Sequence, residues 1–245
     1  TFDDNLKCQF DVAYPVLRKY GITAFWFIYT SPFLGVNERL EIYRYYRTVA
    51  FDSIDEFYEH FFNYIKGSKY ENLVNKGLMN LFSNKYLNEY SFYSKNDKKF
   101  RFIRDRILKE KYFDLMDDII KNDGNFFIDG MRRQLWMNKS CVRKLSKEGH
   151  IIGLHSHTHP MNLGELSYTK QKAEYVKNYD IVKKITGRTP LSVSYPCNSY
   201  NSNTLKIMKN LGILVGFTAT MDSDAKNSLT LPRKDHANLL LEMKS

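Results

Sequence analysis

The chain has 245 residues, a formal net charge of +10, and 43% hydrophobic residues including 15% aromatics. This composition excludes a disordered chain, and the length allows one large domain or two small ones. The three cysteines, Cys8, Cys141 and Cys197, are odd in number and far apart, so they indicate no disulfide framework. No apolar run approaches the roughly 20 residues of a membrane-spanning helix. The sequence contains no zinc-finger spacing and no RNP-like motif, so it does not indicate nucleic acid as a partner.

The chain opens with Thr1-Phe2-Asp3-Asp4, which predicts the end of a strand that leads into a loop. We expect the rest of that strand, and any leader, to precede Thr1. A cell-envelope and a cytoplasmic location are therefore both open.

The next elements predict the beginning of an α/β fold. Val12, Val16 and Leu17 form an apolar face at helical spacing, and Gly21 is typical of a helix end. Residues 22–29 (ITAFWFIY) are almost wholly apolar and predict a strand buried on both faces, as in a parallel sheet. A helix followed by such a strand favours the α/β class.

Residues 31–121 predict a helical insertion. Ser53 and Glu56 have the spacing of a capping box, and residues 71–82 and 100–120 carry apolar residues three and four apart. The segment holds 20 of the 37 aromatic residues. These favour a compact aromatic core, with exposed rings that stack on sugars as the alternative.

The α/β pattern resumes near Asn125 (NFFIDG), which makes residues 1–30 and 122–245 one α/β domain around the insertion. Strands are expected at 151–154, 191–195 and 213–220, alternating with helices that end at Gly149 or cover 167–186 and 202–211.

The positive charge lies mainly in this α/β part. The insertion has 16 basic and 14 acidic residues, which leaves 21 basic and 13 acidic residues elsewhere. The excess indicates an anionic partner, such as an acidic glycan, a phosphate-linked sugar or an anionic membrane surface. Solvated basic helix faces are the plainer alternative.

Four of the six histidines, His150, His155, His157 and His159, fall within ten residues. His155 and His159 are four apart, and on one helical turn both imidazoles would project from the same face toward one ion. On a strand, H-x-H would instead pair His157 with one of the other two. His150 begins a strand, where a structural hydrogen bond is expected.

A catalytic zinc site uses three protein ligands and keeps one position open for water. Two imidazoles and one carboxylate meet that need. Asp3 and Asp4 at a strand end can supply the carboxylate, with the second acid free as a base, although most such pairs are solvated turn residues.

Three motifs and one buried strand together resemble polysaccharide deacetylases of carbohydrate esterase family 4. Residues 1–5 (TFDDN) resemble the first motif, TFDDG, and residues 149–160 (GHIIGLHSHTHP) look like the GHEIGxH[ST]xxHP segment. Residues 194–201 (SYPCNSYN) are similar to the third motif, and residues 21–28 to the buried strand of the family. The resemblance covers residues 1–30 and about 122–245.

The resemblance implies a distorted (β/α) barrel with its site at the carboxyl ends of the strands. It implies a hydrolase that depends on Zn²⁺, or on Co²⁺ or Ni²⁺, and removes N-acetyl, less readily O-acetyl, groups from a surface polysaccharide or its precursor. Asp3 would be the base, and Asp4, His155 and His159 the metal ligands. The backbone N–H of Cys197 would stabilise the oxyanion.

The sequence departs from the family at the third motif, where Ser194 replaces the arginine that orients the base. Arg233 is the candidate substitute, with a surface arginine as the alternative. His236 is the candidate general acid, and Asp235 is expected to orient Arg233 or His236. Asp222-Ser223-Asp224 weakly resembles the fourth motif.

Two other functions fit the same residues. One is a deacylase of a small acylamino or formamido sugar, with the insertion closed over the substrate. The other is a catalytically inactive relative that binds glycan, which the missing arginine motivates.

Overall fold

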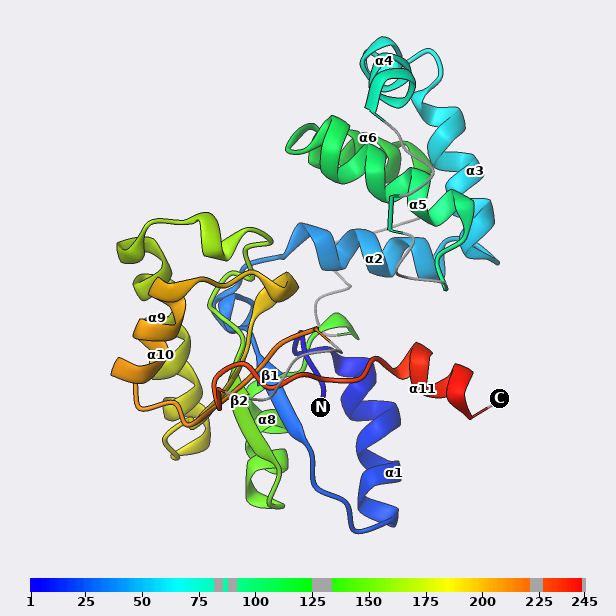
Figure 1. The fold of residues 1–245 in the computed structure, drawn as a ribbon. Helices are drawn as coiled ribbons and strands as arrows, with labels where there is room; N and C mark the ends of the chain where they lie inside the picture. Colours follow the sequence, from blue (N-terminus) through cyan, green and yellow to red (C-terminus); the bar gives the residue numbers. More distant parts are fainter. Residues whose placement is uncertain (82–85, 88–91, 125–133, 221–226, 244–245) are drawn as a thin grey trace. The chain divides into compact units, whose positions relative to one another are not determined.

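The computed structural model describes residues 1–81, 86–87, 92–124, 134–220 and 227–243 (Figure 1). The chain divides into two compact units, Thr1–Glu38 with Gly130–Ser245, and Arg39–Asp129. Residues 31–38 belong with the first unit because the backbone N–H groups of Thr30 and Ser31 both donate to the carbonyl of His157. The Ser31 hydroxyl also donates to Glu38, at 2.6 Å.

The first unit contains a four-stranded parallel sheet. Its strands are β1 (Phe25–Ile28), β2 (Ile151–Leu154), β3 (Ser192–Ser194) and β4 (Val215–Phe217), in the order β1-β2-β3-β4. The four predicted strands are confirmed. Their apolar residues lack a simple alternation because both faces of the sheet are covered.

The sheet is curled but open, so the α/β class is right while the closed barrel is not what the structure shows. Phe25 and Phe27 of β1 contact Phe217 of β4 across the concave face, with ring centres 5.1 and 5.5 Å apart. Single parallel bridges add Phe2 beside Trp26 and Leu231 beside Phe217. Within the described ranges, no backbone ladder joins these two edges.

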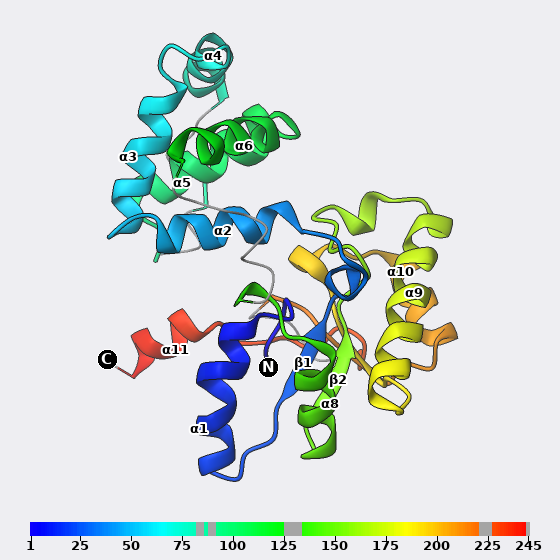
Figure 2. The same cartoon turned by 180° about the vertical axis from the view of Figure 1, so that it is seen from behind.

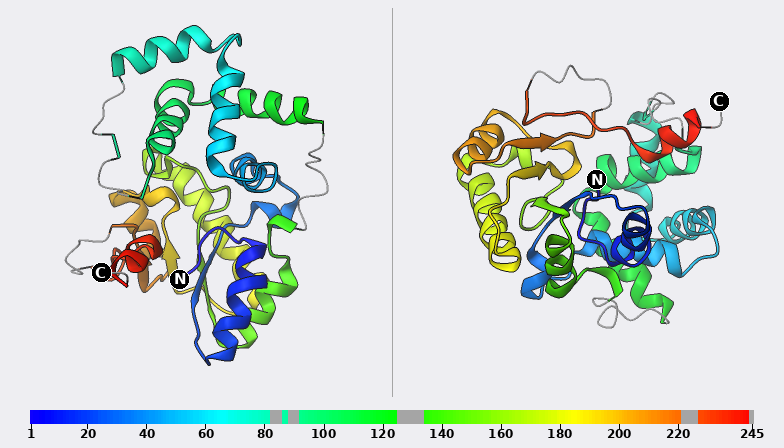
Figure 3. Two further views of the ribbon diagram at one scale, coloured as in Figure 1. Left: turned by 90° about the vertical axis from the view of Figure 1, so that its right-hand side faces the viewer. Right: turned by 90° about the horizontal axis from the view of Figure 1, so that it is seen from below.

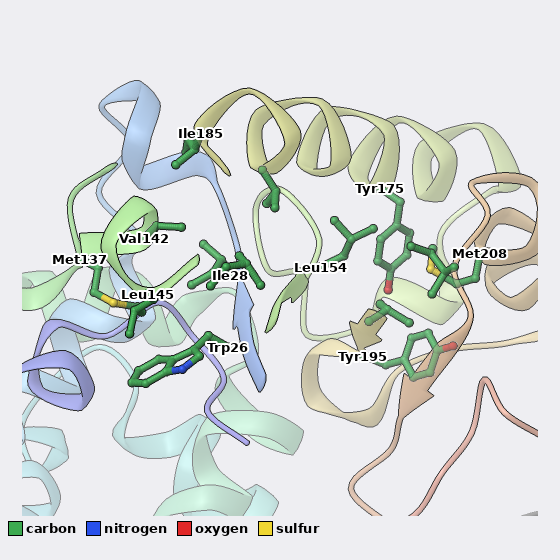
Figure 4. Packing of buried hydrophobic residues seen from close by; sticks show 14 of the residues in the cluster. Trp26, Ile28, Met137, Val142, Leu145, Leu154, Tyr175, Ile185, Tyr195 and Met208 are labelled. Atoms are coloured by element: carbon green, nitrogen blue, oxygen red, sulfur yellow. The ribbon is translucent and has the colours of Figure 1, made fainter. Parts of the chain in front are cut away.

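The convex face is covered by helices. These are α8 (Lys139–Lys147), α9 (Tyr168–Thr186) and α10 (Ser202–Asn210), with α9 and α10 side by side (Figures 1 and 2). Figure 4 shows the resulting core, in which Leu154 lies near Tyr175 of α9 and Ile28 lies between β2 and α8. The sheet therefore has helices on one side and a crowded aromatic interior on the other.

Glycine at position 153 is required by that interior. A Cβ atom there would lie 2.6 Å from the Phe27 ring and 2.5 Å from Ser192 Oγ. Since neither contact is sterically allowed, a side chain at this position would push β1 and β3 away from β2.

The first helix is present, and Leu17 of its predicted apolar face packs against the core, but the prediction is wrong for Val12 and Val16. The π-helical turn η1 (Gln9–Ala13) leads into α1 (Tyr14–Lys19), and Val12 and Val16 are 71% and 53% exposed. Tyr14 is buried instead, because its ring packs against His150 and its hydroxyl donates to Glu148. Tyr14, which combines a buried ring with a hydrogen-bonded hydroxyl, therefore holds α1 against the rest of the unit.

Short elements complete the unit: the 3₁₀ turns η2 (Ser31–Leu34), η4 (Leu163–Glu165) and η5 (Pro196–Asn198), and the helix α11 (His236–Glu242). The NFFIDG segment lies outside the described residues. No helix in the described part of the chain is long and apolar enough to cross a membrane.

The second unit is helical (Figure 3). Its elements are α2 (Arg39–Val49), α3 (Ile54–Ile65), α4 (Glu71–Leu81), α5 (Lys95–Phe102), the π-helix η3 (Ile103–Leu108) and α6 (Lys111–Asp123). The helix expected over 100–120 is interrupted at Lys109, whose φ is +50°. Phe57, Phe61, Phe100 and Tyr112 are buried together, which favours a compact core over a sugar-stacking surface.

Candidate metal centre

Three side chains from the first motif and the histidine cluster converge: Asp4, His155 and His159. Their ligand atoms all lie within 4.8 Å of one another. Asp4 Oδ1 is 3.2 Å from His155 Nε2 and 3.1 Å from His159 Nε2. Because tetrahedral zinc has bonds of about 2.0–2.1 Å to nitrogen and oxygen, its ligand atoms stand about 3.3 Å apart. The donor set therefore fits a divalent ion.

The two histidines converge through a loop and not through the helical turn that their spacing suggested. Ser156 and His159 have φ values of +62° and +56°, in the left-handed region, and Asp4 has +76°. The Ser156 hydroxyl accepts a hydrogen bond from the His159 backbone N–H at 3.1 Å. Left-handed backbone at non-glycine residues is strained, and such strain concentrates at functional sites.

Hydrogen bonding orients the His155 ring toward Asp4. Its Nδ1 lies 2.8 Å from the carbonyl oxygen of Ser194, which can only accept. Nδ1 must therefore carry a proton, and Nε2 is the ring nitrogen that faces Asp4. The backbone carbonyl on β3 thus leaves Nε2 as the nitrogen that would bind a metal.

Two polar residues of α9 hold the histidine loop, and we call them the α9 clamp: Glu174 and Asn178. Glu174 accepts from the backbone N–H groups of His157 and Thr158, at 2.9 and 2.8 Å. Asn178 is fully buried, accepts from the N–H of His155 at 3.0 Å and donates to the carbonyl of Ile28 at 2.8 Å. The clamp ties the loop to the end of β1.

The other two clustered histidines have structural contacts. His157 Nδ1 lies 2.9 Å from the Thr30 hydroxyl, and the ring is buried. His150 accepts a hydrogen bond from the Ala24 N–H at 3.0 Å, as expected for a residue that begins a strand. The structure therefore pairs His155 with His159 and leaves His157 beside them.

Asp3 is held by Arg233 on both carboxylate oxygens. Arg233 Nη1 donates to Oδ1 at 2.8 Å and Nη2 donates to Oδ2 at 2.9 Å, while the Ser194 hydroxyl donates to Oδ2 at 2.9 Å. Burial acts to raise the pKa of Asp3, but the charge of His155 and the Arg233 guanidinium outweigh it and hold the pKa below its usual value. Asp3 is thus ionised at neutral pH.

Arg233 reaches Asp3 from the segment after β4, whereas the family resemblance places an arginine on β3. Its Nε donates to the Thr218 carbonyl at 3.1 Å, and its backbone N–H donates to Thr220 at 3.3 Å. Arg233 Nη2 also donates to Ser194 Oγ at 2.8 Å. The small Ser194 side chain therefore leaves room for the guanidinium and joins its network.

Cys197 has an unusual backbone, with φ +51° and ψ +26° inside η5. The next residue, Asn198, accepts from the Ala219 N–H at 3.0 Å and so ties η5 to the segment that positions Arg233. The role of the Cys197 N–H toward an oxyanion stays a prediction.

The structure does not bring His236 or Asp235 into this group of residues. The His236 side chain is 88% exposed at the beginning of α11, and its contact is with Asp235, at 3.4 Å between Nδ1 and Oδ1. A side chain so exposed has little to hold it against a reacting amide. Residues 222–224, the weak fourth motif, lie outside the described residues.

Sequence reasoning identified Ser194 only as the residue in place of an arginine, and it missed four other residues that build the site: Glu174, Asn178, Tyr29 and Trp136. The Tyr29 ring centre is 5.3 Å from that of His159, and Trp136 Nε1 donates to the Tyr29 hydroxyl. Asn178 had a detectable signal, because it is a polar residue on the buried face that α9 shares with Tyr175, Val182 and Ile185. Tyr29 and Trp136 had none, since each looks like an ordinary core aromatic.

Comparison with known proteins points to one family. Residues 118–216 match the polysaccharide deacetylase family model. The chain is 28% identical over 81 residues to a peptidoglycan-N-acetylglucosamine deacetylase of Bacillus cereus, covering 33% of this chain and 28% of that protein. It is 32% identical over 101 residues to an uncharacterised 30.6 kDa protein of Geobacillus stearothermophilus, covering 40% and 37%. The chain thus matches less than two-fifths of the length of these relatives.

The fold has a counterpart among solved structures. The Streptococcus pyogenes deacetylase PplD, solved in complex with acetate, matches with a TM-score of 0.53 at 17% identity, over 100% of this chain and 69% of that one. The matched family region contains β2, the histidine cluster and the third motif. The resemblance seen in the motifs is therefore confirmed for this part of the chain: residues 118–216 are similar to the polysaccharide deacetylases.

Proposed function

We propose that this protein is a metal-dependent hydrolase that removes the acetyl group from N-acetylated sugars of a surface polysaccharide or its precursor. The observation that carries the proposal is the convergence of Asp4, His155 and His159 beside the ionised carboxylate of Asp3. Together they supply a three-ligand metal site with a base next to it.

Asp4, His155 and His159 would hold the ion. Two imidazole nitrogens and one carboxylate oxygen suit Zn²⁺, and also Co²⁺ or Ni²⁺. When bound, such an ion acidifies a water molecule and polarises the acetyl carbonyl.

Side chains and a backbone N–H of the protein would transfer the proton and stabilise the negative charge of the reaction. Asp3 would take the proton of the attacking water, and Arg233 and Ser194 keep it ionised and fixed in orientation. The backbone N–H of Cys197 would donate to the oxyanion that forms on the carbonyl. The intact Asp3–Arg233 pair favours catalysis over glycan binding alone, because a site used only for binding does not need an oriented base.

The substrate class is supported by one relative and by charge. The Bacillus cereus relative is named for the deacetylation of N-acetylglucosamine in peptidoglycan, which favours an N-acetyl over an O-acetyl group. The 21 basic against 13 acidic residues outside 31–121 favour an anionic glycan.

The test compares wild-type protein with Asp4→Asn. Wild type should bind about one Zn²⁺ per chain, measured by mass spectrometry of the metal, and release acetate from N-acetylglucosamine oligomers or peptidoglycan. Asp4→Asn should bind the ion at least about tenfold more weakly and lose most activity, because it removes a charged ligand. Asp11→Asn, an exposed acid outside the site, is the matched control.

Full activity of metal-free Asp4→Asn protein would refute the proposal. Zinc binding without acetate release from any N-acetylated sugar, together with tight glycan binding, would instead support the inactive glycan-binding relative. Release of acyl groups from monosaccharides alone would support the small-molecule deacylase.

A further inference from the structure

The helical unit contains three neighbouring arginines, two of which lie against one buried aromatic ring. The Cζ atoms of Arg47 on α2 and Arg104 on η3 lie 5.3 and 5.8 Å from the ring centre of Phe100, which is fully buried. Arg44 precedes Arg47 by three residues and so projects from the same side of α2. We call Arg44, Arg47 and Arg104 the arginine cluster.

Two members of the arginine cluster already have carboxylate partners. Arg44 pairs with Glu41, and Arg104 donates two hydrogen bonds to Asp105, at 2.6 and 2.9 Å. Another nearby acid, Asp97, accepts from the Tyr58 hydroxyl and caps α5. Among the described residues, none of these three carboxylates forms an ion pair with Arg47.

Arg47 is the member that lacks such a partner. Among the described residues it forms no ion pair, and its buried Nε has no hydrogen-bond partner. The guanidinium lies over the rings of Phe57 and Phe100, at 5.7 and 5.3 Å. These rings attract a cation, but they offer no acceptor for its N–H groups.

The surroundings of Arg47 disfavour its charge. Burial lowers its pKa, the nearby Tyr112 and Tyr58 act in the opposite direction, and the positive charges of Arg104 and Arg44 lower it further. A partly buried guanidinium beside two others is costly unless an anion joins them.

The arginine cluster is also accessible to a ligand. The side chain of Arg44 is 43% exposed and that of Arg104 is 16% exposed, while Arg47 is half-buried. An anion can therefore reach guanidinium groups that are partly shielded from water, where hydrogen bonds between charged groups are stronger than at an open surface.

We propose that the arginine cluster is a binding site for an oxyanion, the phosphate or carboxylate group of a ligand, with Arg47 as its central donor. The planar N–H fork of a guanidinium matches both groups. The site lies wholly in the helical unit and contains none of the residues of the metal centre, so it does not depend on the proposed hydrolase function.

The test titrates the whole chain, treated with a chelator to remove metal, with inorganic phosphate and separately with glucuronate. Binding is measured by calorimetry and localised by hydrogen–deuterium exchange. We expect saturable binding of at least one of the two, with slower exchange in α2 and η3. Arg47→Met, which keeps an apolar stem over the phenylalanine rings, should weaken binding by about tenfold or more.

Arg106→Met is the matched control, because it removes the same charge from an exposed position on η3. It should bind nearly as well as wild type. Arg47→Lys keeps the charge without the fork and should bind with intermediate affinity, which also tests the proposal if Arg47→Met fails to fold. Binding of phosphate alone or glucuronate alone would identify the group recognised.

The proposal is overturned if neither anion binds. It is also overturned if Arg106→Met weakens binding as much as Arg47→Met, or if exchange slows only around the histidine loop. In each of these cases Arg47 would be a cation held by aromatic rings alone.

Discussion

At the scale of single residues, the site is a set of charges that stabilise one another. Asp3 has a lowered pKa because of His155 and Arg233, and in Asp4 the hydrogen bonds with both histidines outweigh burial and hold the pKa well below its usual value. Both neighbouring carboxylates are therefore kept ionised, and His155 contributes to each. Asp4 faces the two histidines, and Asp3 faces Arg233.

Removing Arg233 should shift the acid side of the pH–rate profile. In Arg233→Met the pKa of Asp3 should rise, because the guanidinium that holds it below its usual value is removed. The base must be deprotonated, so activity lost on acidification should be lost at higher pH than in wild type. The measurement is kcat/KM against pH for acetate release.

Arg188→Met, an exposed arginine after α9, is the control for a change in net charge. An unshifted acid limb in Arg233→Met, with activity merely scaled down at all pH values, would mean that Arg233 does not set the ionisation of Asp3.

His236 tests the limit of the family resemblance. His236→Gln should change kcat/KM by less than about twofold, because the side chain is 88% exposed and contacts Asp235 instead of the metal ligands. Surface substitutions away from a site have small effects. A loss of about a hundredfold or more, the scale of a general acid, would show that α11 moves onto the site when substrate binds.

At the scale of elements, α9 both covers the sheet and positions the histidine loop. Its apolar residues Tyr175, Val182 and Ile185 lie in the core, while the α9 clamp holds the backbone around His155 and His157. Helix α9 thus contributes apolar packing to the core and also holds the strained histidine loop in its conformation.

Weakening the clamp should weaken metal binding. Glu174→Gln replaces a carboxylate that accepts three hydrogen bonds by an amide that places N–H groups against N–H donors. We expect the zinc dissociation constant to rise about 10–100-fold, the usual effect of losing a residue that orients a ligand. A competing chelating dye measures it without any assay of activity.

Asp180→Asn on the same helix is exposed and serves as the control. If Glu174→Gln binds zinc as tightly as this control does, the loop keeps its shape without the clamp.

At the scale of the whole molecule, buried histidines should make stability depend on pH. Burial lowers the pKa of His150, outweighing the nearby charge of Glu148, and burial also lowers the pKa of His157. At His150 and His157 the unfolded chain therefore takes up protons at higher pH than the folded protein does, whereas the pKa of His155, raised by Asp4 against the effect of burial, acts in the opposite direction. The stability contributed by His150 and His157 should be fully present above about pH 6.5, the unfolded value, and fall as the pH drops below it.

The variant His150→Asn isolates this effect. An asparagine oxygen can accept the Ala24 N–H without titrating, so the free energy of unfolding should fall less between pH 7.5 and 5.5 than in wild type. Urea unfolding at the two pH values measures the difference. Equal falls in both proteins would show that other groups cause the acid sensitivity.

Much of the fold could be predicted because its signals are local. Each strand is a short apolar run between a helix end and a polar loop, and β2 lies where residues 151–154 were expected. The histidine spacing and the adjacent aspartates likewise predicted the residues that converge at the metal centre. The buried face of α1 could not be predicted, because Tyr14 gains partners, Glu148 and His150, that are more than a hundred residues away.

The sequence alone therefore determined the class of fold, the resemblance to polysaccharide deacetylases and the chemical types that gather at the metal centre, since each motif consists of residues close together in the chain. Only the tertiary structure decided that the sheet stays open, that Arg233 meets Asp3 across 230 positions of sequence, and that Ser194 and the α9 clamp orient both. The physical reason is that an ion pair or a buried hydrogen bond depends on distance in space. That distance is set when the two edges of the curled sheet approach each other.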